Sequence, residues 1–306
     1  MTGTALPPTA AAPSSVAAVA ELSAGARLRR RMFGQKSFVF GVGLLLVIVA
    51  VALLAPVLAP HDPYAQNLSQ RMVPPFWYAK GSWEHLLGTD NLGRDYLSRL
   101  LYGARISLLI GLSVMVISGL IGTTMGLLAG YFGGKADLIV TFLITTRLAM
   151  PVILVALAVV AMVGGSLPVV ILVLGFLKWD RFAVVMRSAT QQARALDYVT
   201  AAEAAGASTP RIILGEILPN VFPQLIVVAT LEAASAILLE AALSFLGLGV
   251  QPPLPSWGLM ISEAKTYMFF SFWLIAIPGT LLALLVLSIN LAGDGLRDVV
   301  APEGRG

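Results

Sequence analysis

The sequence predicts an all-α membrane protein with six transmembrane helices, and three observations support this fold class. Apolar residues make up 58% of the 306 residues, charged residues only 12%, and the mean hydropathy is +0.86. Soluble domains carry about 25% charged residues. Six long apolar stretches follow one another along the chain, and Lys and Arg concentrate in alternate connections between them. These features exclude a water-soluble globule and a wholly disordered chain.

The first predicted span follows a polar beginning. Residues 1–27 are rich in Ala, Pro, Ser and Thr and are expected to form a disordered cytoplasmic tail. Several arginines follow, and then an uncharged stretch runs from Ser37 to Pro60. This stretch exceeds the roughly 7 to 15 apolar residues of a signal peptide. We therefore expect the first transmembrane helix over about 38–58.

A long loop and a second span come next. Residues 28–102 form an N-terminal region that holds the first helix and a Pro-rich, aromatic external loop. Asp95 or Asp90 in this loop is interpreted as part of a structural cap on the second helix, near the helix N-terminus, although the loop could equally pack against a partner. The second span is expected over about 106–131. Its small residues at every fourth position predict close helix packing, with a hinge as the alternative: Ser118, Gly122, Gly126 and Gly130.

Four further spans complete a transmembrane domain over 103–294, and residues 295–306 form an expected cytoplasmic tail. The spans are expected at about 138–163, 169–186, 221–246 and 269–291. The third is interrupted by Arg147 and Pro151. Six spans put both termini on one side. Eleven Lys and Arg then lie on the cytoplasmic side against six outside, which agrees with the positive-inside rule and explains the net charge of +4 without nucleic acid.

The residues exclude most catalytic chemistry. The chain has no Cys, and its two histidines, His61 and His85, are far apart in the sequence, so neither disulfides nor a metal site is expected. Gly134-Lys135 lacks the remainder of a phosphate-binding loop. We therefore predict no catalytic, cofactor or metal residues and no enzyme activity. If the protein uses ATP, another chain hydrolyses it.

Charged residues inside the predicted spans are the first candidate site. Arg147, Lys178 and Glu232 lie nine to eleven residues into their spans, roughly 14 to 17 Å deep at about 1.5 Å per residue. A charge there costs about 2.5 to 3.5 kcal/mol and needs a partner or a water-filled cavity. Two readings stay open: structural pairing, for example Arg147 with Glu232, or a cavity that meets the charged ends of a substrate. The full candidate set is Arg147, Lys178, Asp180, Glu232 and Glu240.

The second candidate site is the polar segment between the fourth and fifth spans. Ala201, Ala202, Ala204 and Ala205 favour a helix and Gly206 ends it. A short helix of small residues can fit into a cleft on another protein, and an ordinary amphipathic connector is the alternative.

This segment resembles the EAA loop of ABC importer permeases. The alanine pair, Gly206 and the Leu218-Pro219 pair have the spacing of that motif. Thr200 stands where many relatives have the Glu of the motif, and Glu203-Ala204-Ala205 is a similar triplet out of register. The resemblance implies that this helix docks on an ATPase subunit. The implied docking residues are Thr200, Ala201, Ala202, Glu203, Ala205, Gly206, Ala207, Ser208, Leu218 and Pro219.

Five further motifs narrow the resemblance to the "C" subunit of dipeptide, oligopeptide and nickel importer permeases. The first motif, residues 87–107, contains Leu87-Gly-Thr-Asp and Gly93-Arg-Asp. The other four occupy residues 129–134, 240–253, 255–258 and 290–298. Glu232 departs from the family pattern, which has a small residue there. So do Phe142 and Thr145, where relatives carry Arg and Asp, and Val184, where they carry Arg. These departures lie inside the membrane and bear on substrate choice.

The resemblance implies a subunit of a heteromeric importer in the bacterial cytoplasmic (inner) membrane. Its implied partners are a second homologous permease, two ATP-binding subunits, an extracytoplasmic substrate-binding protein and membrane lipid. ATP and Mg would be bound by the ATPases, and no cofactor by this chain. Di- or oligopeptides are the expected substrates, with nickel or another small solute as the alternative. An ATP-independent channel or an ion-coupled carrier is the alternative from a different class.

Overall fold

The computed structural model describes residues 34–300, with side chains up to residue 297, and the regular elements in that range are helices. In chain order they are α2 (Lys36–Leu53), α3 (Ala55–Leu58), η1 (Leu68–Gln70), α4 (Tyr96–Phe132), α5 (Gly134–Ala149), α6 (Val152–Val163), α7 (Leu167–Leu177), α8 (Asp180–Arg194), α9 (Asp197–Ala204), α10 (Thr209–Arg211), the π-helical η2 (Ile212–Ile217), α11 (Leu218–Phe245), α12 (Trp257–Ala264), η3 (Lys265–Tyr267) and α13 (Trp273–Val300). The all-α prediction is confirmed for these residues. The expected tail at 1–27 lies outside them.

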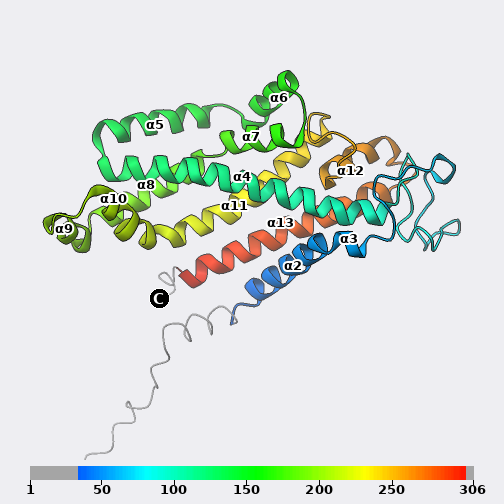
Figure 1. Ribbon diagram of the computed structural model, residues 1–306, viewed down its shortest axis with the longest axis horizontal. Helices are drawn as coiled ribbons and strands as arrows, with labels where there is room; N and C mark the ends of the chain where they lie inside the picture. Colours follow the sequence, from blue (N-terminus) through cyan, green and yellow to red (C-terminus); the bar gives the residue numbers. More distant parts are fainter. Residues whose placement is uncertain (1–33, 301–306) are drawn as a thin grey trace, which may run out of the picture.

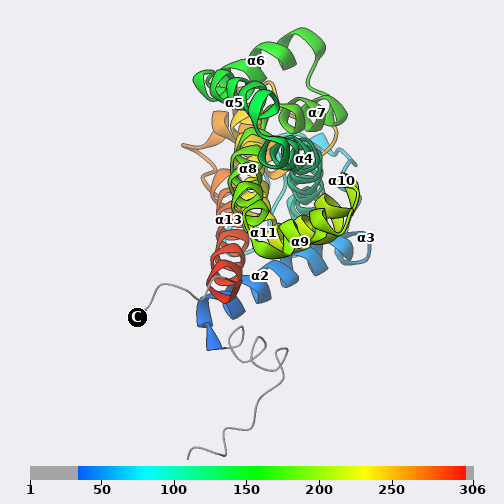
Figure 2. The same ribbon diagram turned by 90° about the vertical axis from the view of Figure 1, so that its left-hand side faces the viewer.

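The long helices run side by side along the long axis of the molecule (Figure 1). Helices α4, α11 and α13 form its centre, with α2 on one side and α5 and α6 on the other in both views (Figure 1, Figure 2). Helix α9 lies at one end of the long axis, and the loop between α3 and α4, residues 59–95, lies at the other (Figure 1). The α9 region and the α3–α4 loop therefore lie far apart on the molecule.

Four helical stretches in the described range are long and apolar enough to cross a membrane: α2, α4, the continuous stretch Thr209–Phe245, and α13. Helices α5 and α6 make a fifth only if they are one broken span, because they meet at an angle of 82°. Residues 34–300 thus hold four or five such spans, and the prediction of six is not confirmed.

Breaks in the predicted third and fourth spans explain why fewer than six continuous spans are found. The predicted third span divides at Met150, which has extended backbone angles (φ −98°, ψ 127°). Pro151 follows, and a proline both disfavours the α conformation of the residue before it and lacks an N–H for the helix. The predicted fourth span divides at Lys178 and Trp179, between α7 and α8. Pro151 marks the first break in the sequence, whereas the second break contains no proline or glycine that would mark it.

Two helices are longer than predicted. Helix α4 begins at Tyr96 rather than near 106, because Asp95 caps it by accepting a hydrogen bond from the Ser98 N–H at 2.8 Å. The predicted capping role of Asp95 is confirmed. Helix α13 continues to Val300, so the tail expected from residue 295 begins within a helix.

Asp90 takes part in a buried ionic cluster at the same end of α4. Its carboxylate contacts Arg94 at 2.6 Å and also Arg99, which is fully buried. Both arginines also contact Glu263 on α12, at 3.2 and 2.8 Å. The cluster joins the α3–α4 loop, α4 and α12, which is the structural role expected for this part of the sequence.

Candidate functional site

Glu232 is a buried acid that forms an ion pair across two helices. It lies on α11, is 1% exposed, and its Oε2 is 2.7 Å from Nζ of Lys178, which ends α7. Lys178 also donates a hydrogen bond to the Ser235 hydroxyl at 2.8 Å, one turn along α11. Among the described residues, neither carboxylate oxygen of Glu232 accepts a well-directed hydrogen bond. The pair is therefore held mainly by charge.

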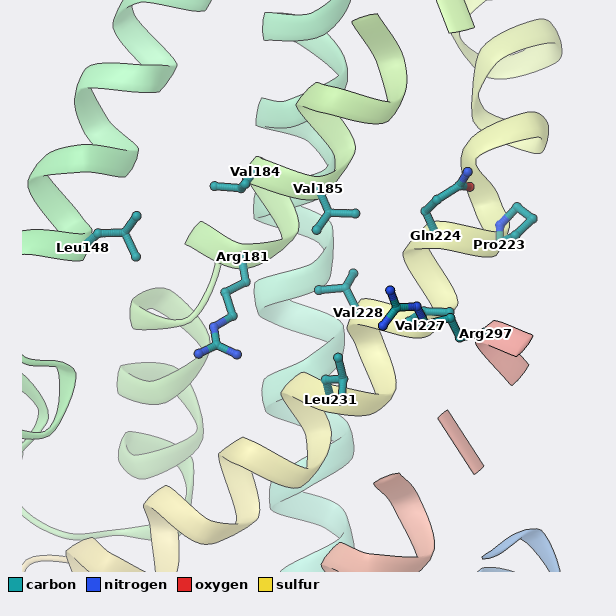
Figure 3. A pocket seen from close by; sticks show the side chains of 10 residues that line it. All are labelled: Leu148, Arg181, Val184, Val185, Pro223, Gln224, Val227, Val228, Leu231 and Arg297. Carbon is teal, nitrogen blue, oxygen red and sulfur yellow. The ribbon is translucent and has the colours of Figure 1, made fainter. Parts of the chain in front are cut away.

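Arg181 extends this pair into an open pocket. Its Nε lies 3.4 Å from Oε1 of Glu232, while 67% of its side chain is exposed. The pocket has a volume of about 620 Å³ and is lined by residues of α5, α8, α11 and α13. Figure 3 shows Arg181 and Arg297 apart, with Val228 between them in that view, and most of the other lining residues are apolar. Two guanidinium groups around an apolar cavity suit a ligand that carries a carboxylate.

The predicted pairing of Arg147 with Glu232 is wrong. Arg147, at the end of α5, donates instead to the carbonyl of Leu177 at 2.6 Å and to that of Met150 at 3.3 Å. These bonds satisfy backbone groups left free by the breaks after α5 and α7. Arg147 thus links the end of α5 to the end of α7 and stabilises the backbone at both breaks.

Asp180 and Glu240, the other two embedded acids, each interact with the N-terminal end of a helix. Asp180 is buried in the first turn of α8, where the helix dipole favours a negative charge. Glu240 is fully buried on α11, and its Oε1 accepts from Ser244 at 2.7 Å and from Ser256 at 3.0 Å. Ser256 caps α12, so Glu240 joins α11 to α12 and does not line the pocket.

The second candidate site, around α9, has the predicted helix and the predicted glycine stop. Gly206 has a left-handed φ of +76°, which glycine adopts without the clash of a Cβ atom. Its N–H donates to the Glu203 carbonyl at 3.0 Å, and the Ala207 N–H donates to the Ala202 carbonyl at 3.1 Å. These two bonds form a Schellman motif, so Gly206 ends α9 as a helix cap.

One face of α9 is anchored and the other is exposed. Val199 is fully buried against the Ile212, Ile213 and Ile217 side chains of the π-helical turn. The exposed residues of the predicted docking set are Thr200, Ala201, Glu203, Ala205, Gly206, Ser208 and Pro219, while Ala202, Ala207 and Leu218 are half-buried. A small-residue face of this kind is open to a partner.

Glu203 also has an internal role. Its Oε1 accepts a hydrogen bond from the Tyr131 hydroxyl at 3.1 Å, which ties α9 to the end of α4. Arg194 bonds the Tyr131 carbonyl, and its guanidinium lies 5.2 Å from the centre of the Tyr131 ring. The orientation of α9 is therefore set by α4 and α8 together.

Sequence reasoning missed two residues of the pocket. Arg181 belongs to the charged run that begins at Lys178, and Arg297 lies in the last of the family-like motifs, but neither was a candidate pathway residue. Their signal in the sequence is only a charge near an apolar stretch. The pocket itself depends on how α5, α8, α11 and α13 meet, which no sequence spacing specifies.

Comparisons with known proteins agree with the motifs. Residues 122–305 match the model of the binding-protein-dependent transport system inner membrane component family. Residues 23–75 match the N-terminal transmembrane domain of oligopeptide transport permease C.

Curated relatives and solved structures extend this likeness. The chain is 46% identical to the Di/tripeptide transport system permease protein DppC of Pseudomonas aeruginosa, over 86% of this chain and 87% of that protein. It is 41% identical to the dipeptide permease DppC of Haemophilus influenzae, over 86% and 89% of the two chains. A structure of the inward-facing MetNI methionine ABC transporter, 21% identical, matches with a TM-score of 0.52 over 66% of this chain and 96% of its own, which shows a common fold. The chain belongs to the family of binding-protein-dependent transport system inner membrane components and is a permease subunit of an ABC importer.

Proposed function

We propose that this chain forms one half of the translocation pathway of an ATP-driven importer of di- or oligopeptides. The observation that carries the proposal is the 46% identity to a protein named as a di/tripeptide permease, which extends over nearly the whole of both chains. The pocket beside Arg181 and Arg297 supports it, because a peptide carries a terminal carboxylate and apolar side chains.

The membrane topology is part of the proposal. In it, α7 and the first half of α8 together make the fourth span, with Lys178 neutralised by Glu232, so that six spans place both termini in the cytoplasm. The end of the molecule with α9 then faces the ATPase subunits, and the α3–α4 loop faces the outside.

The mechanism follows from the position of α9. Two ATPase subunits bind ATP and Mg, and their closure moves α9, whose anchored face transmits the motion to α4, α8 and α11 through Val199, Glu203 and the π-helical turn. A second permease completes the pathway, and an extracytoplasmic binding protein delivers the peptide. This chain supplies the pathway and the docking helix, and the ATPases supply the hydrolysis.

Reconstitution into proteoliposomes tests the proposal. The complex of this chain with a second permease, the ATPases and the binding protein should accumulate radiolabelled dipeptides only when ATP is present with the ATPases. Uptake of nickel but not of peptides would show that the substrate is nickel and not a peptide. Uptake by this chain alone, without ATP, would contradict the proposal and favour a channel or carrier.

A further inference from the structure

Three side chains with metal-binding atoms meet at the end of the molecule opposite α9. His61 follows α3, His85 lies in the middle of the α3–α4 loop, and Asp95 caps α4. The centres of the two imidazole rings are 4.8 Å apart, although 23 residues separate them in the sequence. One nitrogen of each ring and one Asp95 oxygen lie within 4.8 Å of one another.

Hydrogen bonds around His85 fix which of its nitrogens carries hydrogen. Asn67 Oδ1 accepts from the Ser69 N–H, so Asn67 Nδ2 is the donor of the 3.0 Å bond to Gln70 Oε1. Gln70 Oε1 is thus an acceptor, and the His85 Nε2, 3.2 Å away, donates to it. In neutral His85 the Nδ1 atom then carries a lone pair.

That lone pair faces a carboxylate. His85 Nδ1 lies 2.8 Å from Oδ1 of Asp95, and both atoms are buried acceptors in this state. His61 Nδ1 lies 3.6 Å from the same oxygen. It is buried and makes no hydrogen bond within the part of the chain that the structure describes. Asp95 Oδ2 is already occupied by the Ser98 N–H.

We propose that His61, His85 and Asp95 bind a divalent transition-metal ion such as Zn²⁺, with water as a fourth ligand. At Zn–ligand bonds of about 2.0 to 2.1 Å, neighbouring ligand atoms of a tetrahedron lie about 3.3 Å apart. The separations of 2.8 and 3.6 Å from Asp95 Oδ1 are on either side of this value. Two imidazoles and one carboxylate suit zinc or nickel better than Mg²⁺ or Ca²⁺.

The surroundings have the form of a metal site. A histidine ligand normally donates its second ring N–H to a carbonyl or carboxylate, which fixes the ring. Gln70 accepts that bond from His85. A bound cation also gives a partner to His61 Nδ1, which is buried and makes no hydrogen bond among the described residues. The ion would fasten the beginning of the α3–α4 loop, at His61, and its interior, at His85, to Asp95 at the start of α4.

Zinc binding to the purified full chain tests the proposal. The protein is prepared with a histidine-free affinity tag, stripped with chelator, and titrated with Zn²⁺ against a chromophoric competitor. The wild type is expected to bind one ion per chain. His61→Ala, which removes no hydrogen bond, is expected to weaken binding tenfold or more, and Asp95→Asn, which keeps a capping oxygen, to do the same. Glu84→Gln, an exposed carboxylate beside His85, is the control and should bind as the wild type does.

A cysteine at position 61 gives a direct signature. The chain has no Cys, so a sulfur-to-metal charge-transfer band in Co²⁺-loaded His61→Cys can come only from that residue. Its appearance, and its loss in His61→Cys combined with His85→Ala, would support the site. Absence of stoichiometric zinc in the wild type, or equal zinc affinity in the wild type and His61→Ala, would overturn it and leave His85 as a hydrogen-bond partner of Asp95. Either result leaves the peptide importer proposal untouched.

Discussion

Lys178 and Glu232 join the break between α7 and α8 to the middle of α11, with Nζ and Oε2 2.7 Å apart and side chains 8% and 1% exposed. The pair fastens the break between α7 and α8, where the helix is interrupted, to α11, a helix of 28 residues beside it. Removing one member of a buried pair leaves a charge without compensation, at a cost of about 3 to 5 kcal/mol. The ion pair therefore holds the start of α8 against α11, and it also neutralises the two buried charges.

This relationship predicts strong coupling between the two positions. Lys178→Met alone is expected to lower stability by about 3 kcal/mol, because it leaves Glu232 with only the exposed Arg181. The double variant with Glu232→Leu should recover most of that loss. Thermal unfolding of the detergent-purified chain measures both. Losses that simply add in the double variant would show that the charges act independently.

Arg181 is predicted to act on substrate and not on assembly. Its side chain is mostly exposed in the pocket, so Arg181→Gln should leave complex formation unchanged. If it meets the peptide carboxylate, the KM for a free dipeptide should rise about tenfold or more, as expected for loss of a charged hydrogen bond. The KM for the C-terminally amidated peptide should change little. Equal effects on both peptides would remove Arg181 from carboxylate recognition.

Gly206 is predicted to couple transport to ATP hydrolysis through its place at the exposed end of α9. Gly206→Asp introduces a charge there, while Asp, like Asn, can adopt the left-handed conformation of this position. Substrate-stimulated ATPase activity of the reconstituted complex should fall sharply. Gly206→Asn is the matched control, since Asn tolerates this conformation without adding charge. Wild-type stimulation in the Asp variant would exclude this surface as the docking site.

The sequence predicts those features that depend only on residues within or next to a single helix. The glycine stop of α9 and the cap of α4 by Asp95 are local, and both were predictable. The partner of Glu232 was not, because Arg147 and Lys178 are both distant in the sequence and only the breaks after α5 and α7 decide between them. The same holds for His61 and His85, which the path of the α3–α4 loop brings together.

The small-residue stripe of α4 shows how a periodic signal becomes a packing contact. Gly122 lies so close to α8 that an added Cβ would stand 2.2 Å from the Trp179 carbonyl oxygen. Added Cβ atoms at Gly126 and Gly130 would stand 2.7 Å from Met186 Cβ and 2.6 Å from Thr190 Cβ. The predicted close approach is confirmed, since no side chain beyond hydrogen fits at these positions.

Substitutions at two glycines of α4 separate this contact from the general effect of replacing glycine. Gly126→Val is expected to force α4 and α8 apart and to cost about 3 kcal/mol or more, because backbone atoms of α8 lie in the way and cannot turn aside. Gly119→Ala on the same helix is the control. Its Cβ would meet only the Phe182 ring at 3.4 Å, an ordinary contact, and alanine favours the helix by about 1 kcal/mol. Thermal unfolding of the two purified variants should therefore show a large loss for the first and little change or a gain for the second. Similar losses in both would mean that the stripe lowers stability through helix propensity and not through packing.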